Sequence, residues 1–338
     1  MTQHTEGGVP SDDQLETITG DDNDEILYSA QLQRAFKADL RLRRRAEAGT
    51  LHRIGRGQYI TATRWFDLDD DRRYSLRVRG AATLRQTELV LSHQSAAVLW
   101  GLPSRVRWPD EVHFTIERTG GGRSKPGIVK HALGLDPRSI TRKDGLLVTT
   151  VARTVIDLAA TLDLRGAMAA ADRALAIDPW NRVPPLTTRA ELLEEWERML
   201  PFRGSVRARA VIDFATSLSG SVNETDSRVT IALIGFPEPI LQQRFIVDDR
   251  EFFSDFFWLA QRGVGEADGR SKYFDEVLRG GRSLEQVVYD EKLREDGIRR
   301  QVNGFTRWDS ATGRSQKRLR ARLVPLGLPI GRPRLFVR

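Results

Sequence analysis

The order of helices and strands predicted between residues 204 and 323 restricts the fold of this chain more than any other feature. Helices are predicted over 204–217 and 221–234, followed by strands over 239–247, 252–258 and 262–268. A helix over 283–296, a strand over 302–308 and a helix over 314–323 complete the block. Helices that flank a run of strands in this order are typical of an α/β/α layered architecture, which we expect here.

Three acidic residues occupy unusual positions in this block. Glu224 lies in the second predicted helix, Asp255 interrupts the aromatic strand "FFSDFFW", and Glu266 lies at the end of the next strand. Adjacent strands that each present a carboxylate at the same end offer the oxygen ligands that Mg²⁺ or Mn²⁺ prefers. A cation there would lower the pKa of a bound water and shield charge on a phosphodiester. The sequence therefore predicts a metal site at Asp255 and Glu266.

Structural roles explain part of the same pattern. Glu224 and Arg228 are four residues apart on a predicted helix, which is the spacing of a surface ion pair. Asp268 precedes a glycine and fits the turn that ends a strand. Asp255 is harder to explain in this way, because a carboxylate among four aromatic neighbours is costly unless it is paired or exposed.

The motif "SDFFW" followed by "VGEADGRSKY" resembles the core of PD-(D/E)xK nucleases, and more closely the bacterial domains related to very-short-patch-repair endonucleases. The pattern of those domains is an Asp, a strand, and then Glu-x-Asp-Gly-x-x-His. "SVNETDSRV" resembles their first helix, and "YDEKLREDGIRRQVNGFTRW" resembles their helix and last strand. The resemblance implies a restriction-endonuclease-like domain. Its metal ligands would be Asp255 and Glu266, joined by Glu224 and Asp268, with Lys272 orienting the attacking water.

Two departures from that pattern bear on activity. The usual nuclease lysine, two residues after the second acid, is Asp268 here, and the histidine of the related domains is Lys272. No histidine follows His131, which excludes a histidine-based mechanism in this domain. Two interpretations stay open: a Mg-dependent DNA endonuclease, and a decayed nuclease fold that serves binding.

A DNA-binding module is predicted near the N-terminus. Ser29 fits the N-cap of a first helix, "LRLRRRAEAG" forms a second helix ended by Gly49, and "TLHRIGRGQYI" forms a short hairpin. This order is that of a winged helix, whose recognition helix enters the major groove of double-stranded DNA. The predicted DNA-binding residues are Arg41, Arg43, Arg44, Arg45, Arg53 and Arg56.

The stretches "LRLRRRAEAGTLHRIGRGQYI", "LSHQSAAVLWGLP" and "GLLVTTVARTVIDLA" together resemble actinobacterial proteins with a winged helix of the AbiEi antitoxin type. The resemblance implies a transcriptional repressor or antitoxin with a cognate toxin protein as partner. A tempting catalytic set is better interpreted as helix caps and local hydrogen bonds. Its members are Ser92, His93, Thr150, Arg153 and Asp157.

We therefore expect an α+β and α/β chain in four parts. They are an acidic disordered tail (1–24), a winged helix (25–62), a mixed α/β antitoxin-like domain (63–203) and an endonuclease-like α/β/α domain (204–338). Residues 1–25 contain eight acids and no Lys or Arg, so the net charge of +7 conceals about +15 on the remainder. This charge indicates a polyanionic partner, with an arginine-rich proteome as the alternative. The basic stretch "RSQKRLRAR" (314–322) fits either a phosphate backbone or a solvated helix face.

The chain contains no cysteine, which excludes disulfides, cysteine-ligated zinc and thiol nucleophiles. No basic-then-apolar signal begins the sequence, and no apolar run approaches the length of a membrane span. We expect a cytoplasmic protein with no membrane partner.

Overall fold

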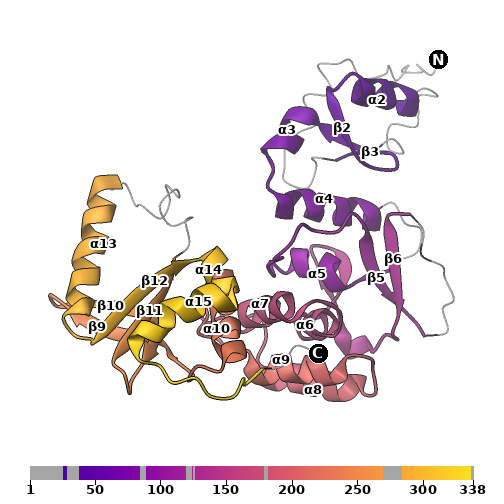
Figure 1. Cartoon of the computed structure of the whole chain (residues 1–338). Helices are drawn as coiled ribbons and strands as arrows, with labels where there is room; N and C mark the ends of the chain where they lie inside the picture. Colours follow the sequence, from indigo (N-terminus) through magenta and orange to yellow (C-terminus); the bar gives the residue numbers. More distant parts are fainter. Residues whose placement is uncertain are drawn as a thin grey trace, which may run out of the picture. The chain divides into compact units, whose positions relative to one another are not determined.

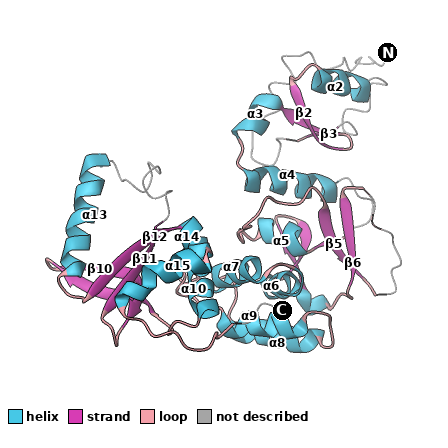
Figure 2. Cartoon of the chain, in the orientation of Figure 1, coloured by secondary structure: helices cyan, strands magenta, loops and turns pink. Residues whose placement is uncertain are grey.

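The computed structural model describes residues 26–28, 38–83, 89–118, 124, 126–178, 182–268 and 284–335 (Figure 1). These residues form a mixed α/β chain with three separate sheets (Figure 2). The chain divides into two compact units: Met1–Gly101 with Arg107–Thr150, and Leu102–Val106 with Val151–Arg338. The boundary expected between residues 203 and 204 lies inside the second unit. The acidic tail and the expected helix capped by Ser29 lie outside the described residues.

A small three-stranded sheet begins the first unit. Its antiparallel order is β1-β3-β2, and helix α2 precedes β2 along the chain. The elements are β1 (Leu27–Tyr28), α2 (Ala38–Glu47), β2 (Leu51–Gly55) and β3 (Gln58–Thr61). The α2 helix is followed by Gly49, whose φ of +79° is a left-handed conformation that favours glycine. The second helix and the hairpin are therefore as predicted, whereas β1 was not predicted.

A five-stranded sheet of order β6-β5-β4-β8-β7 forms the rest of the first unit. Its strands are β4 (Val90–Leu91), β5 (Val112–Ile116), β6 (Ile128–Ala132), β7 (Ile140–Lys143) and β8 (Leu146–Thr149). The accompanying helices are α3 (Ala62–Asp67), α4 (Asp70–Thr83), α5 (His93–Leu99) and the short 3₁₀ helix η1 (Pro137–Ser139). Strand β7 and helix α3 were not predicted.

Four helices open the second unit: α6 (Val151–Thr161), α7 (Leu164–Leu175), α8 (Arg189–Met199) and α9 (Ser205–Phe214). The N-terminus of α8 is fixed by a capping box, in which Thr188 and Glu191 each bond the other's backbone N–H. These helices pack on one another and, through α7, on the helix that begins the C-terminal block.

The C-terminal sheet has the order β12-β11-β10-β9. Its elements are α10 (Val222–Ile234), β9 (Ile240–Val247), β10 (Arg250–Trp258), β11 (Gly263–Asp268), α13 (Leu284–Arg299) and β12 (Gly304–Asp309). Strands β9 to β11 are antiparallel, and β12 is parallel to β11. A parallel pair needs a crossover connection, and α13 lies in that connection.

Helices cover both faces of this sheet, as the order of elements predicted (Figure 1). On one face Phe256 and Trp308 pack with Ile231 of α10 and Leu319 of the last helix. On the other face the apolar core contains Ile298 of α13. The α/β/α layering thus follows from strands that alternate aromatic residues between two covered faces.

The helix predicted over 314–323 is α15 (Gln316–Leu323), which the 3₁₀ turn η2 (Val324–Leu326) follows. The short helix α14 (Ser310–Arg314) before it was not predicted. Ser315 has an extended backbone, and its hydroxyl accepts the N–H of Arg318 to cap α15. Asp309 caps α14 in the same way. Two closely spaced caps therefore divide the segment. Within the described residues, no helix is long and apolar enough to cross a bilayer.

Candidate functional site

The ladder between β10 and β11 ends one residue before the two carboxylates predicted as metal ligands. Phe256 pairs with Gly265, so Asp255 and Glu266 are the next facing positions. Facing residues of an antiparallel pair point to the same side of a sheet, here the side covered by α13. Asp255 accepts the backbone N–H of Ala267 through Oδ2 at 2.7 Å. The two strands therefore separate at this point. The Asp255 carboxylate accepts the N–H of Ala267, which no longer has a partner in the β10–β11 ladder.

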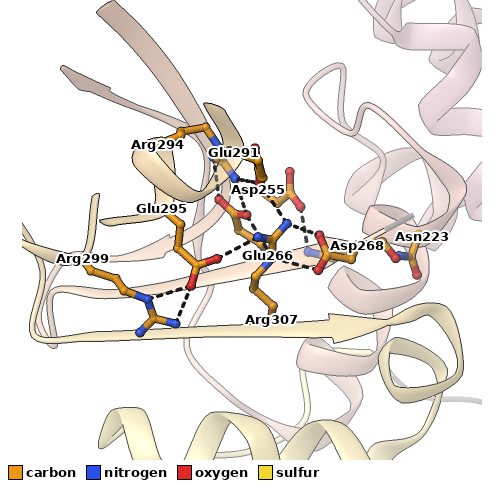
Figure 3. A network of polar contacts seen from close by, with 10 residues as sticks. Asn223, Asp255, Glu266, Asp268, Glu291, Arg294, Glu295, Arg299 and Arg307 are labelled. Carbon is orange, nitrogen blue, oxygen red and sulfur yellow. Dashed lines mark hydrogen bonds and ion pairs between the residues drawn. The ribbon is translucent and has the colours of Figure 1, made fainter. Parts of the chain in front are cut away.

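Glu266 is held by an arginine of α13 (Figure 3). Arg294 donates Nη1 to Oε1 at 2.9 Å and Nη2 to Oε2 at 2.7 Å. The Glu266 side chain is buried, with the residue 4% exposed. A two-bonded arginine–carboxylate fork of this kind is among the strongest neutralising contacts a buried carboxylate can make.

Asp268 is held in the same manner by an arginine of β12. Arg307 donates Nε to Oδ2 at 2.8 Å and Nη2 to Oδ1 at 2.6 Å. Its Nε also lies 3.7 Å from Oε2 of Glu266, its register partner on the parallel strand. The backbone carbonyl of Asp268 accepts the side-chain amide of Asn223 at 2.9 Å, which ties the end of β11 to α10.

Two acids of α13 complete the arrangement. Glu291 accepts hydrogen bonds from Arg294 and Arg307, and Glu295 accepts from Arg307 and Arg299. Burial lowers the pKa of Arg294, but hydrogen bonds to Glu291 and Glu266 outweigh burial and raise it. We call this set the carboxylate–arginine network. Its members are Asp255, Glu266, Asp268, Glu291, Arg294, Glu295, Arg299 and Arg307.

Two of the carboxylates that were predicted to bind Mg²⁺ or Mn²⁺, Glu266 and Asp268, are partnered by arginines in this arrangement. Such a cation needs several oxygen ligands in near-octahedral geometry. Each oxygen of Glu266 and of Asp268 already accepts an N–H from an arginine. Among the described residues, no group of three or more His, Asp or Glu side chains is arranged to hold a metal. The chemistry that these contacts support is charge neutralisation within the fold.

Glu224, the third predicted ligand, has a different role. Its carboxylate accepts the N–H of Gly220, the hydroxyl of Ser221 and the amide of Gln242, none of which belongs to the network. These bonds organise the start of α10, where Ser221 is the N-cap. Lys272, the predicted water-orienting residue, lies outside the described residues.

The interpretation of Glu224 and Arg228 as a surface ion pair is wrong. Both side chains are buried, and Arg228 donates Nη2 to both oxygens of Asp172 on α7, at 2.9 and 2.8 Å. Thr225 also donates to Asp172, at 2.7 Å. A buried arginine needs a charged partner, and Arg228 finds it in Asp172. The Arg228–Asp172 ion pair therefore joins α10, at the start of the C-terminal block, to α7.

The basic residues predicted to bind DNA gather on α2 and on the adjacent hairpin. Arg41, Arg43 and Arg44 are exposed on α2, and Arg45 is half-buried. Both hairpin arginines, Arg53 and Arg56, are also exposed, the second of them in the turn. Between the strands and α3, His52 stacks on Trp65 at 4.3 Å. The structure thus brings the predicted arginines onto one small module.

Sequence reasoning missed the arginines of the network. Arg307 lies between aromatic residues in "GFTRWD", which is the same signal that drew attention to Asp255. Arg294 follows Glu291 by three residues, and Arg299 follows Glu295 by four, which are the spacings of helical ion pairs. These spacings predict pairs along α13 but not the contact with Glu266.

The residues considered as a catalytic set belong to two different units. In the first unit, Oγ of Ser92 lies 3.0 Å from Nδ1 of His93. The His93 ring stacks on that of His131, with 3.6 Å between the ring centroids. His113 and His131 join this stack with ring nitrogens 3.0 Å apart. Burial lowers the pKa of both histidines to about 4. In the second unit, a buried ion pair of 2.9 Å joins Arg153 and Asp157 within α6.

A scan against protein-family models finds no match, and a search of curated proteins finds no significant relative.

Proposed function

We propose that this protein binds double-stranded DNA through α2 and the hairpin β2–β3, and that it acts as a regulator and not as a nuclease. The observation that carries the proposal is the exposed basic face of α2 beside a hairpin that also presents arginines. An α-helix fits the major groove, and arginine side chains neutralise phosphates on its edges.

The packing of α2 supports this orientation. Leu42 is 3% exposed and packs with Leu27, Leu51 and Tyr59 of the three-stranded sheet. A helix that buries Leu42 must direct Arg44 to the opposite face, with Arg41 and Arg43 on its flanks. The order of α2, β2 and β3, with β1 as the third strand, agrees with a winged helix, which we propose for residues 26–61.

We propose that the C-terminal block is a nuclease-like fold that no longer cuts. A helix, three antiparallel strands, a crossover helix and a parallel fourth strand support the resemblance to PD-(D/E)xK nucleases. The forks of Arg294 on Glu266 and of Arg307 on Asp268 favour a binding role over catalysis. The resemblance of the N-terminal half to AbiEi-type antitoxins supports a repressor, with a cognate toxin as a proposed partner.

Charge reversal on α2 tests the DNA-binding proposal. Arg41, Arg43 and Arg44 changed to Glu should weaken binding of a labelled duplex at low salt by about two orders of magnitude, measured by fluorescence anisotropy. A matched control changes Arg72, Arg107 and Arg138, which are exposed elsewhere in the same unit, to Glu. Equal affinity of the α2 variant and the control would overturn the assignment of α2.

A second candidate function is Mg-dependent phosphodiester hydrolysis. The observation that favours it is the placement of Asp255 and Glu266 at facing positions, where β10 and β11 separate. Supercoiled plasmid is incubated with Mg²⁺ or Mn²⁺ and with wild type, Asp255→Asn or Glu266→Gln. If the protein is a regulator, we expect wild type and both variants to nick the plasmid equally, at the background rate. Faster nicking by wild type than by the variants would show that the protein is an endonuclease.

A further inference from the structure

The last segment of the chain has a charge of one sign only. From Ser310 to the C-terminus there is no Asp or Glu, although the whole chain contains 46 such residues. Eight basic residues occur in the same segment: Arg314, Lys317, Arg318, Arg320, Arg322, Arg332, Arg334 and Arg338. Four of these eight lie on one short helix, α15. We call Lys317, Arg318, Arg320 and Arg322 the α15 patch.

The packing of α15 directs the whole patch to solvent. Leu319 and Leu323 are fully buried in the core beneath the helix, with Trp308 and Ile231. These two leucines are four residues apart and form the inner face of the helix. All four residues of the α15 patch are exposed. The helix therefore needs only two leucines to dock, and the rest of its surface is free to carry charge.

The charges on α15 do little to stabilise the helix itself. Arg318 and Arg322 are four residues apart, and like charges at this spacing repel by a few tenths of a kcal/mol, which is about the size of a favourable pair. Lys317 and Arg318 lie in the first turn, where the helix dipole disfavours cations, whereas Arg320 and Arg322 lie in the last turn, where it favours them. Within the described part of the chain, none of the four forms an ion pair with a carboxylate.

Other arginines of the same unit show the contrast. Arg294 and Arg307 each hold carboxylates in the network, and Arg334 pairs with Glu238 at 3.0 Å. Cations without carboxylate partners, collected on the exposed surface of one short helix, are the electrostatic footprint of a polyanion-binding surface. Duplex DNA presents about one negative charge per 1.7 Å of helix axis, so it can oppose all four cations together.

We propose that the α15 patch is a second nucleic-acid-binding surface, which contacts the phosphate backbone of DNA without reading its sequence. The inference rests on the proposed function in that its ligand is the same duplex, but the surface lies on the other unit. Contacts to phosphate fix position and contribute affinity, whereas base contacts carry specificity. Through the α15 patch, the second unit thus contributes affinity for DNA independently of α2.

The test is a salt series of anisotropy titrations with the full chain and a labelled duplex. The α15 variant carries Lys317→Gln, Arg318→Gln, Arg320→Gln and Arg322→Gln. The matched control carries Arg173→Gln, Arg182→Gln, Arg203→Gln and Arg209→Gln, which are exposed residues elsewhere in the second unit. The slope of log affinity against log salt falls by roughly 0.9 for each phosphate that the protein no longer neutralises, so the α15 variant should show a slope smaller by about 2 to 4. The control should keep the wild-type slope.

Each outcome separates this inference from the proposed function. A wild-type slope in the α15 variant, together with weak binding by the α2 variant, overturns the patch alone. Weak binding by the α15 variant together with unchanged binding by the α2 variant overturns α2 and supports the patch. Wild type that binds no DNA contradicts both. Anionic lipid vesicles are the comparison ligand, and loss of vesicle binding with unchanged DNA binding would show that the patch meets a membrane surface instead.

Discussion

At the scale of single residues, the carboxylates predicted as metal ligands also fasten β11 to its neighbours. Asp255 was conspicuous in the sequence because a carboxylate among aromatic residues needs a partner. Glu266, which faces Asp255 on the next strand, is a second carboxylate that needs a partner. Arg294, 28 residues further along the chain, is that partner. The sequence predicts that a buried carboxylate has a cationic partner, but a metal ion and an arginine meet the same requirement. Only the packing of α13 on the sheet distinguishes them.

Removing Arg294 should destabilise the fold. Arg294→Ala leaves Glu266 buried without its fork, and breaking a buried ion pair in this way typically costs about 3–5 kcal/mol. Urea unfolding measures the loss. Lys292→Ala, an exposed residue of the same helix, is the control and should lie within about 0.5 kcal/mol of wild type. Equal stability of the two variants would show that the fork contributes nothing.

The stacked histidines make the stability of the first unit depend on pH. His113 and His131 have folded pKa values of about 4, below the ordinary 6.5, because burial disfavours the charged ring. The unfolded chain therefore binds protons that the folded chain does not, and stability falls as the pH falls from 6.5 towards 4. Partial exposure reduces the effect, so we expect a loss of about 1–3 kcal/mol.

Thermal unfolding between pH 7 and pH 4.5 measures this loss. The variant His113→Gln/His131→Gln removes both titrating rings, and its melting temperature should depend less on pH than that of wild type. A wild-type melting temperature that does not change over this window, or that rises, would contradict the buried neutral pair.

At the scale of elements, helix α13 reaches the sheet through a glycine. A Cβ on Gly297 would lie 2.1 Å from Cγ1 and 2.7 Å from Cγ2 of Val247, a β-branched residue of β9. The branched side chain is stiff and cannot turn away cheaply. The close approach places Arg294 and Glu291, earlier on the same helix, over the carboxylates of β11. Glycine at this position is thus part of how the network forms.

Gly297→Ala should therefore destabilise the protein, although alanine is the better helix former. We expect a loss of about 1–3 kcal/mol in urea unfolding, from overpacking against Val247. An exposed glycine-to-alanine change inside a helix would instead gain up to about 1 kcal/mol. A variant more stable than wild type would mean that α13 does not pack this closely.

The longer elements could be predicted from the sequence, whereas short ones were predicted only where a turn signal marked them, as Gly55-Arg56-Gly57 marks the hairpin β2–β3. Helices α10 and α13 and strands β9 to β11 span enough residues to show their periodicity. Strand β1 has two residues and β7 has four, so neither shows a pattern. Helix α14 was missed because its five residues are too few to show a period, and its cap Asp309 looks like an ordinary polar residue.

At the scale of the whole molecule, charge is distributed unevenly along the chain. The first 25 residues hold eight acids, whereas α2 and α15 present exposed arginines. Removing residues 1–25 raises the net charge from +7 to about +15, which should strengthen attraction to a polyanion. We expect tighter DNA binding by the truncated protein, by about tenfold at low salt, with the difference shrinking as salt rises. Unchanged affinity at low salt would contradict an electrostatic contribution from this segment.

Hydrogen–deuterium exchange of the full chain, with and without duplex DNA, shows where the duplex is bound and so tests whether α2 and the hairpin bind it. We predict slower exchange in α2 and the hairpin β2–β3, over residues 38–61, when DNA is added. The five-stranded sheet should exchange as before. Unchanged exchange over residues 38–61 in a saturated DNA complex would contradict the proposal that this module is the DNA-binding surface.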